Sequence, residues 1–178
     1  MDRSLVESFD RLCAQRKSIL EQFAGLSESQ LNFRHNPEDW SLLEELHHLV
    51  LVDTQILIQI ENPTLVTKMA KQKSKIPYFI VMAVLRSGIR VPVPNNDERL
   101  LPQPGQSLST LVNEWKVTLD KIQGQLEALS GERIHSPFMV HPMCGGIKPA
   151  PFIYFLMAHD GYHLRNIKRT KRSKSLPK

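Results

Sequence analysis

Two histidines near the end of the chain give the clearest chemical signal in the sequence. His159 and His163 are four residues apart, so on a helix their imidazoles project from the same face, one turn apart. That face is otherwise apolar, because Phe152, Leu156 and Ile167 complete the spacing of a buried helical stripe. Unpaired polar groups are costly in a core, and one bound metal ion would satisfy both rings.

The spacing of the pair on its own is also compatible with two other interpretations. Buried histidines often only hydrogen-bond to a carbonyl or a carboxylate. The pair also has the spacing of the His-Glu-x-x-His motif of zinc peptidases, with Asp160 in place of the glutamate. The shorter aspartate would not reach the same water molecule, and Gly161 weakens the helix, so the sequence disfavours a peptidase.

Helices must position these residues, because no segment alternates like a strand. The apolar spacing predicts four long helices, over residues 4–23, 41–60, 107–129 and 149–169. Ser41 followed by Glu44 would form a capping box, although a start of the second helix at Glu38 is equally compatible. We therefore expect an all-α fold, a four-helix bundle with a long crossover between helices 2 and 3, in one domain over residues 1–168.

The crossover itself is the least regular part of the sequence. Residues 76–85 are apolar enough for a short helix over the bundle. Prolines make residues 91–96 and 101–105 an extended loop. Loops of this length in compact domains are often functional, so this one could cover a cleft.

A metal site needs a third ligand from another helix. His47 and His48 flank the apolar stripe of the second helix on opposite sides, so periodicity leaves open which of them is the ligand. The other histidines, His35, His135 and His141, fall in predicted loops and are expected to be exposed.

Three further residues are expected to be buried. Asp53 lies on the apolar stripe of the second helix, and His163 or Arg165 is its expected partner. Trp40 and Trp115 are expected to pack in the core.

Composition narrows the class of protein. With 178 residues, of which 41% are hydrophobic, the chain can bury a core without disulfides. Cys13 and Cys144 lack the spacing of a disulfide framework or a metal site. No apolar run is long enough to span a bilayer and the N-terminus does not resemble a signal peptide, so no membrane partner and a cytoplasmic location are expected.

The net charge of +5 comes from the end of the chain. Residues 168–178 carry six lysines and arginines and no acid, and without these six charges the rest of the chain is at −1. The segment 169–178 is therefore expected to be a flexible, solvated tail. Nucleic-acid binding is not expected, because no folded face carries the charge.

Two motifs together resemble the DinB-like (YfiT-like) family. The first resembles that family's Trp-Ser-x-x-Glu-x-x-x-His-Leu segment and consists of Trp40-Ser41, Glu44, His48 and Leu49. The second is the pair His159-x-x-x-His163. The helix order, the long connection and the loop at Gly145-Gly146 also fit, so the resemblance covers most of residues 1–168. Members of this family are four-helix bundles, often dimers, that bind a divalent metal through three histidines.

The resemblance implies a ligand set for this chain. His48, His159 and His163 would bind a divalent metal, with zinc, nickel or iron as candidates, and His48 is chosen over His47. Three imidazoles would leave positions open for water or substrate, as in catalytic sites.

Residues near these ligands add one candidate role and one departure from the family pattern. Glu44, one turn before His48, is the candidate catalytic residue: it could orient a ligand or accept a proton, and equally it could only cap the helix. The family commonly has Gly-Gln after the last histidine, whereas this chain has Leu164-Arg165, which could alter the pocket or a helix contact.

Characterised members of the family include metal-dependent transferases of low-molecular-weight thiols and a thiol-dependent isomerase. The resemblance therefore implies an enzyme that transfers such a thiol, as co-substrate, to a small electrophile, and it implies a homodimer. A non-catalytic, stress-related bundle that binds a metal or a partner is one alternative. A metal-dependent hydrolase is the other.

Overall fold

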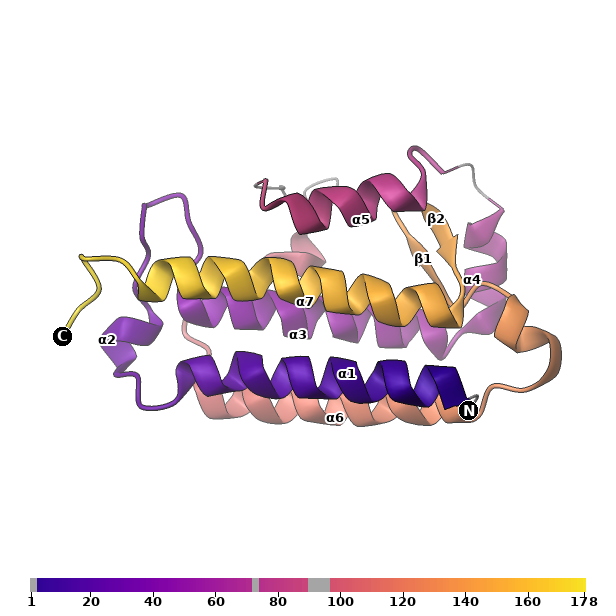
Figure 1. Ribbon diagram of the computed structural model, residues 1–178, viewed down its shortest axis with the longest axis horizontal. Helices are drawn as coiled ribbons and strands as arrows, with labels where there is room; N and C mark the ends of the chain where they lie inside the picture. Colours follow the sequence, from indigo (N-terminus) through magenta and orange to yellow (C-terminus); the bar gives the residue numbers. More distant parts are fainter. Residues whose placement is uncertain (1–2, 72–73, 90–96) are drawn as a thin grey trace.

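Four long helices form the body of the molecule. The computed structural model describes residues 3–71, 74–89 and 97–178. The long helices are α1 (Arg3–Leu20), α3 (Leu42–Ile60), α6 (Leu108–Glu127) and α7 (Pro149–Lys171). They lie along the long axis of the molecule (Figure 1), with α3 packed against α6 and α7, and α1 packed against α7. The predicted all-α four-helix bundle is confirmed.

The start of α3 follows from local capping. The Ser41 hydroxyl accepts a hydrogen bond from the Glu44 backbone N–H, and the Glu44 carboxylate accepts one from the Ser41 N–H at 2.8 Å. This capping box satisfies two N–H groups that no helical carbonyl can reach. Of the two starts that the sequence allowed, the one at Ser41 is correct.

The crossover between α3 and α6 contains more helix than the sequence predicted. It holds α4 (Pro63–Ala70), α5 (Tyr78–Ser87) and the 3-10 turn η3 (Glu98–Leu100). The Asn62 side chain accepts from the Leu65 N–H, so Asn62-Pro63 ends α3 and also caps α4, which was not predicted. The predicted short helix is α5, which lies over α7 on the outside of the bundle (Figure 1). Of the predicted loop, residues 91–96 lie outside the described residues.

Smaller elements join the long helices. After α1 come the 3-10 turn η1 (Glu21–Phe23) and the short helix α2 (Glu28–Leu31), and η4 (Gly131–His135) follows α6. An antiparallel hairpin of β1 (Met139–His141) and β2 (Gly145–Ile147) precedes α7, although no strand was predicted.

The hairpin escaped prediction because its strands are too short to show alternation. Val140 pairs with Gly146, where an added Cβ would meet Pro137 and Ala70 at 3.1–3.2 Å. Gly145 has a φ of 75°, a conformation that side chains disfavour. These glycines therefore belong to the strand β2 and not to a plain loop.

A buried ion-pair network joins all four long helices. Arg16 of α1 lies with its Nη1 2.6 Å from Asp53 Oδ2, and its Nε donates to Asp160 Oδ2 at 2.8 Å. Trp115 Nε1 donates to Asp53 at 2.9 Å, and the Arg16 guanidinium lies 4.7 Å from the Trp115 ring. The predicted partners of Asp53 were wrong, because the cation comes from α1. Trp115 is buried as predicted, whereas Trp40, which was also expected in the core, is only partly buried.

Among the helices in the described part of the chain, none has both the length and the apolar character of a membrane span.

Candidate metal centre

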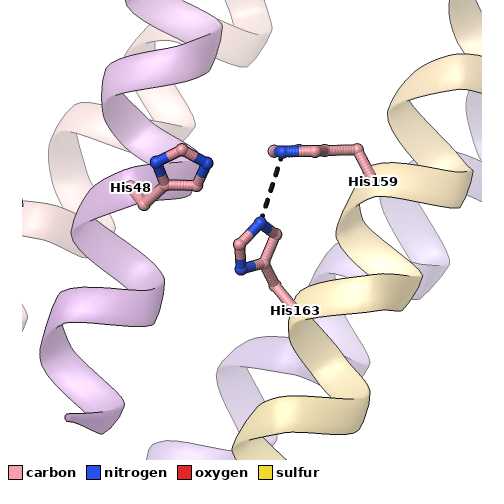
Figure 2. Close-up of side chains that lie close together, drawn as sticks. All are labelled: His48, His159 and His163. Carbon is pink, nitrogen blue, oxygen red and sulfur yellow. Dashed lines mark hydrogen bonds between the residues drawn. The ribbon is translucent and has the colours of Figure 1, made fainter. Parts of the chain in front are cut away.

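Three histidines from two helices converge beside the bundle core. His48 projects from α3, and His159 and His163 project from α7 toward it (Figure 2). One ligand nitrogen from each ring lies within 4.8 Å of the others, and the Nε2 atoms of His159 and His163 are 3.3 Å apart. This spacing is compatible with the binding of one metal ion by all three rings.

The two neighbouring histidines of α3 have different partners. His48 Nδ1 donates to the Leu100 carbonyl at 2.7 Å, so the Nε2 of a neutral ring is free to act as a ligand. His47 Nδ1 accepts from the Gln103 backbone N–H at 3.1 Å. The structure thus brings His48, and not His47, to the α7 pair; the His48 ring contacts the last residue of η3, and the His47 ring contacts the loop that follows it.

Glu45 is a site residue that sequence reasoning missed. Its Oε2 lies 2.5 Å from His163 Nδ1, and both side chains are buried. A carboxylate on the far nitrogen of a metal-binding histidine fixes the orientation of the ring and raises its basicity. Its position one helical turn before His48 was the available signal, since residues i and i+3 share a face.

Burial keeps the three imidazoles neutral. Desolvation, with the neighbouring His163 ring, lowers the pKa of His48 to about 3, and desolvation likewise lowers that of His163 to about 3. The pKa of His159 is well below its ordinary value for the same reasons. Neutral rings are the form that binds metal, so no proton has to leave at neutral pH.

The carboxyl groups of α3 differ in their surroundings. Burial raises the pKa of Glu45 to about 8, an effect that His48 and a hydrogen bond from Asn166 oppose. Glu44, the predicted catalytic residue, places its carboxylate on the Ser41 N–H and on Arg34 in an ion pair. Both oxygens of Glu44 are thus engaged at the helix start.

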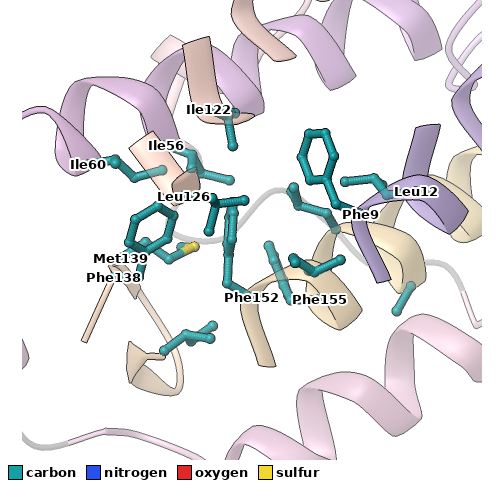
Figure 3. Packing of buried hydrophobic residues seen from close by; sticks show 14 of the residues in the cluster. Phe9, Leu12, Ile56, Ile60, Ile122, Leu126, Phe138, Met139, Phe152 and Phe155 are labelled. Atoms are coloured by element: carbon teal, nitrogen blue, oxygen red, sulfur yellow. The ribbon is translucent and has the colours of Figure 1, made fainter. Parts of the chain in front are cut away.

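Aromatic rings enclose the histidines. Trp40 lies 4.7 Å from the His48 ring and is stacked on His163 at 6.1 Å between ring centroids. Phe155, which also belongs to the apolar core drawn in Figure 3, is stacked on His159 at 5.9 Å. His48 and His163 are buried, whereas His159 is half-buried, so the site is most open on the His159 side.

Two residues beside the candidate ligands on α7 point elsewhere. Asp160 pairs with Arg16 in the bundle interior, so it does not take the place of the catalytic glutamate of a zinc peptidase. Arg165, which departs from the family pattern, donates to the Leu85 carbonyl near the end of α5. The departure therefore creates a contact between α7 and α5.

His141 corrects a prediction. It lies on β1 and is partly buried, and its Nδ1 accepts from the Met143 backbone N–H at 3.2 Å. Its ring meets the edge of Phe155 at 5.2 Å, and burial lowers its pKa to about 4. The other two predicted loop histidines, His35 and His135, are exposed as expected.

Comparison with known proteins gives one family. A family model of the DinB superfamily matches residues 11–167. No curated protein and no solved structure matches the chain significantly.

Proposed function

Because the chain belongs to the DinB superfamily, we propose that it is a divalent-metal enzyme with His48, His159 and His163 as the ligands of zinc, nickel or iron. The observation that supports this most is the convergence of three neutral imidazoles, two of which are oriented through their second nitrogen. The Leu100 carbonyl orients His48, and Glu45 orients His163. Such outer contacts are typical of built metal sites.

The proposed reaction is the transfer of a low-molecular-weight thiol to a small electrophile. A bound divalent metal would lower the pKa of the thiol and polarise the electrophile. The chain itself supplies three ligands, which leave coordination positions for a substrate. It also supplies the rings of Trp40 and Tyr162, which lie against His48 and His163 and would limit the access of water to these two ligands. The half-buried His159 marks the side from which a substrate would approach.

The metal content of the purified protein tests the first part of this proposal. We expect about one divalent ion per chain, lost in His159→Ala and in His163→Ala. His47→Ala is the matched control, since it removes a neighbouring histidine whose ring contacts Gln103 instead of the site. A protein that binds no divalent metal, or that loses it equally in His47→Ala, would contradict the ligand assignment.

Thiol conjugation tests the reaction. Metal-loaded protein should accelerate the coupling of small thiols to a model electrophile, and His159→Ala should abolish the acceleration. Ester or amide cleavage without any thiol dependence would instead indicate a hydrolase. Metal binding with neither activity would indicate a non-catalytic bundle.

We further propose that residues 1–168 form one domain that assembles as a homodimer. Apolar side chains on and beside α5 are exposed, with Phe79 at 70% and Ile89 at 64%. Their exposure supports the proposal that a second copy of the chain covers this face. Sedimentation equilibrium should give twice the chain mass, and a monomer at all concentrations would contradict the proposal.

A further inference from the structure

A basic cavity lies at the C-terminal end of α7, and we propose that it binds a small, multiply charged anion. Its volume is about 720 Å³. Five lysine and arginine side chains line it together with His35, namely Arg165, Lys168, Arg169, Arg172 and Lys174. No aspartate or glutamate is among the described residues that line this basic cavity.

Segments distant in the sequence build the basic cavity. His35 comes from the connection between α2 and α3, and its Nδ1 lies 3.0 Å from the Ser173 hydroxyl, just after α7. Gln30 of α2 donates to the Pro177 carbonyl at 2.9 Å, which places the end of the chain against α2. These contacts gather the basic side chains around one volume instead of spreading them along an extended strand of chain.

The basic cavity carries more positive charge than the interaction with the helix dipole of α7 accounts for. Cations in the last turn of a helix interact favourably with its dipole, which accounts for Lys168 and Arg169. Arg172 and Lys174 follow the last residue of α7, and neither has an ion-pair partner among the described residues. Lys171 lies between these pairs but donates to the Gln22 carbonyl at 2.5 Å and does not line the cavity. The like charges that remain repel one another, and a bound anion would offset this repulsion.

The shape and charge of the basic cavity indicate the class of ligand. Its volume falls in the range of small-molecule sites, about 300–1,000 Å³. Guanidinium groups bind phosphate and carboxylate oxygens with two parallel hydrogen bonds, and lysines add point charges. A small molecule with a phosphate group or several carboxylates would therefore fit. This proposal does not depend on the metal site, so His159→Ala protein should keep the binding.

Calorimetric titration at physiological ionic strength tests the proposal, with inorganic phosphate, pyrophosphate and succinate as probes. We expect at least one of these anions to bind saturably, and the three probes separate phosphate from carboxylate recognition. Because pyrophosphate can chelate metal, each titration is repeated with His159→Ala protein. Arg172→Gln/Lys174→Gln should weaken the binding about tenfold or more, since two charged contacts are lost.

The matched control is Lys116→Gln/Lys121→Gln, which removes the same charge from exposed positions of α6. This control should bind the anion as the unmodified protein does, and circular dichroism checks that both variants fold. An equal loss in both variants would overturn the proposal by showing only long-range attraction. No binding of any probe would also overturn it, as would tighter binding to duplex RNA or to anionic lipid vesicles.

Discussion

His163 is the histidine whose orientation is most completely determined by its neighbours. Glu45 holds its Nδ1, Trp40 is stacked on its ring, and its Nε2 lies toward His159. A ring fixed in this way loses little conformational freedom when it binds a metal, so each of these contacts should contribute to affinity.

Replacing Glu45 by Gln should weaken metal binding by about 10- to 100-fold, the usual effect of removing an outer carboxylate. The amide keeps the size of the side chain but, unlike Glu45, cannot ionise to the carboxylate that would accept from His163 Nδ1–H once the other nitrogen binds a metal. Competition with a chromogenic chelator measures the affinity.

The adjacent residue supplies the control for this prediction. Glu44→Gln should leave metal affinity unchanged, because the Glu44 carboxylate contacts Ser41 and Arg34. Equal weakening in both variants would contradict the role of Glu45. A loss of activity in Glu44→Gln with metal retained would instead support the catalytic role expected for Glu44 from the sequence.

At the scale of the helices, Arg16 connects three elements through charge. It pairs with Asp53 of α3 and Asp160 of α7, and it lies over Trp115 of α6. All of these side chains are buried, so the arginine neutralises acids that have no access to water.

Arg16→Met should destabilise the fold by about 3–5 kcal/mol, because it leaves buried carboxyl groups without their cation. Urea denaturation followed by circular dichroism measures the loss. Arg11→Met, at an exposed position of the same helix, should change the stability by less than about 0.5 kcal/mol. If the two variants were equally stable, the network would have no structural role.

The sequence predicted the helices well where the pattern was local. The capping box at Ser41 and the apolar stripes predicted the long helices correctly, because each of these signals is formed by residues only three or four positions apart. The partner of Asp53 was missed because Arg16 is distant in sequence. Arg16 nevertheless occupies a stripe position of α1 between Leu12 and Ile19, and a charge within an apolar stripe was the available signal.

The candidate site was predicted in part for the same reason. The spacing of His159 and His163 is a property of one helix, whereas the choice between His47 and His48 depends on which face of α3 meets α7. Glu45 was missed because its partner, His163, lies on another helix. Periodicity describes one helix at a time and cannot pair side chains across two.

At the scale of the whole molecule, buried titratable groups make the stability depend on pH. Four histidines have lowered pKa values: His48, His141, His159 and His163. Among the described residues, the carboxyl groups with raised pKa values are Glu45, at about 8, and Asp160, at about 6, with burial as the main cause in each case. The two sets act in opposite directions.

The metal-free protein should lose stability as the pH falls below about 6.5. In that range the unfolded chain binds protons on histidines that the folded state keeps neutral, whereas the raised carboxyl groups favour the folded state. Four histidines outweigh two carboxyl groups, and below about pH 4.5 the carboxyl groups are protonated in the unfolded chain too, so the loss should steepen. Above pH 6.5 stability should also fall, because folded Glu45 keeps a proton that the unfolded chain has already released, and this loss should level off above about pH 8.

Thermal unfolding of metal-free protein between pH 4 and pH 8 measures this profile. His141→Gln removes one lowered pKa without touching a ligand and should make the acid side shallower. A midpoint independent of pH below 6.5 would contradict the prediction.

The contacts of α3 with η3 and the loop after it have a consequence for which residues of this segment can change. His48 contacts the carbonyl of Leu100, which any residue can offer, and His47 contacts the N–H of Gln103, which any residue except proline can offer. The side chains of this loop can therefore change in evolution while its backbone stays anchored on the two rings. The surface that this segment presents can therefore vary without disturbing the contacts of the two imidazoles.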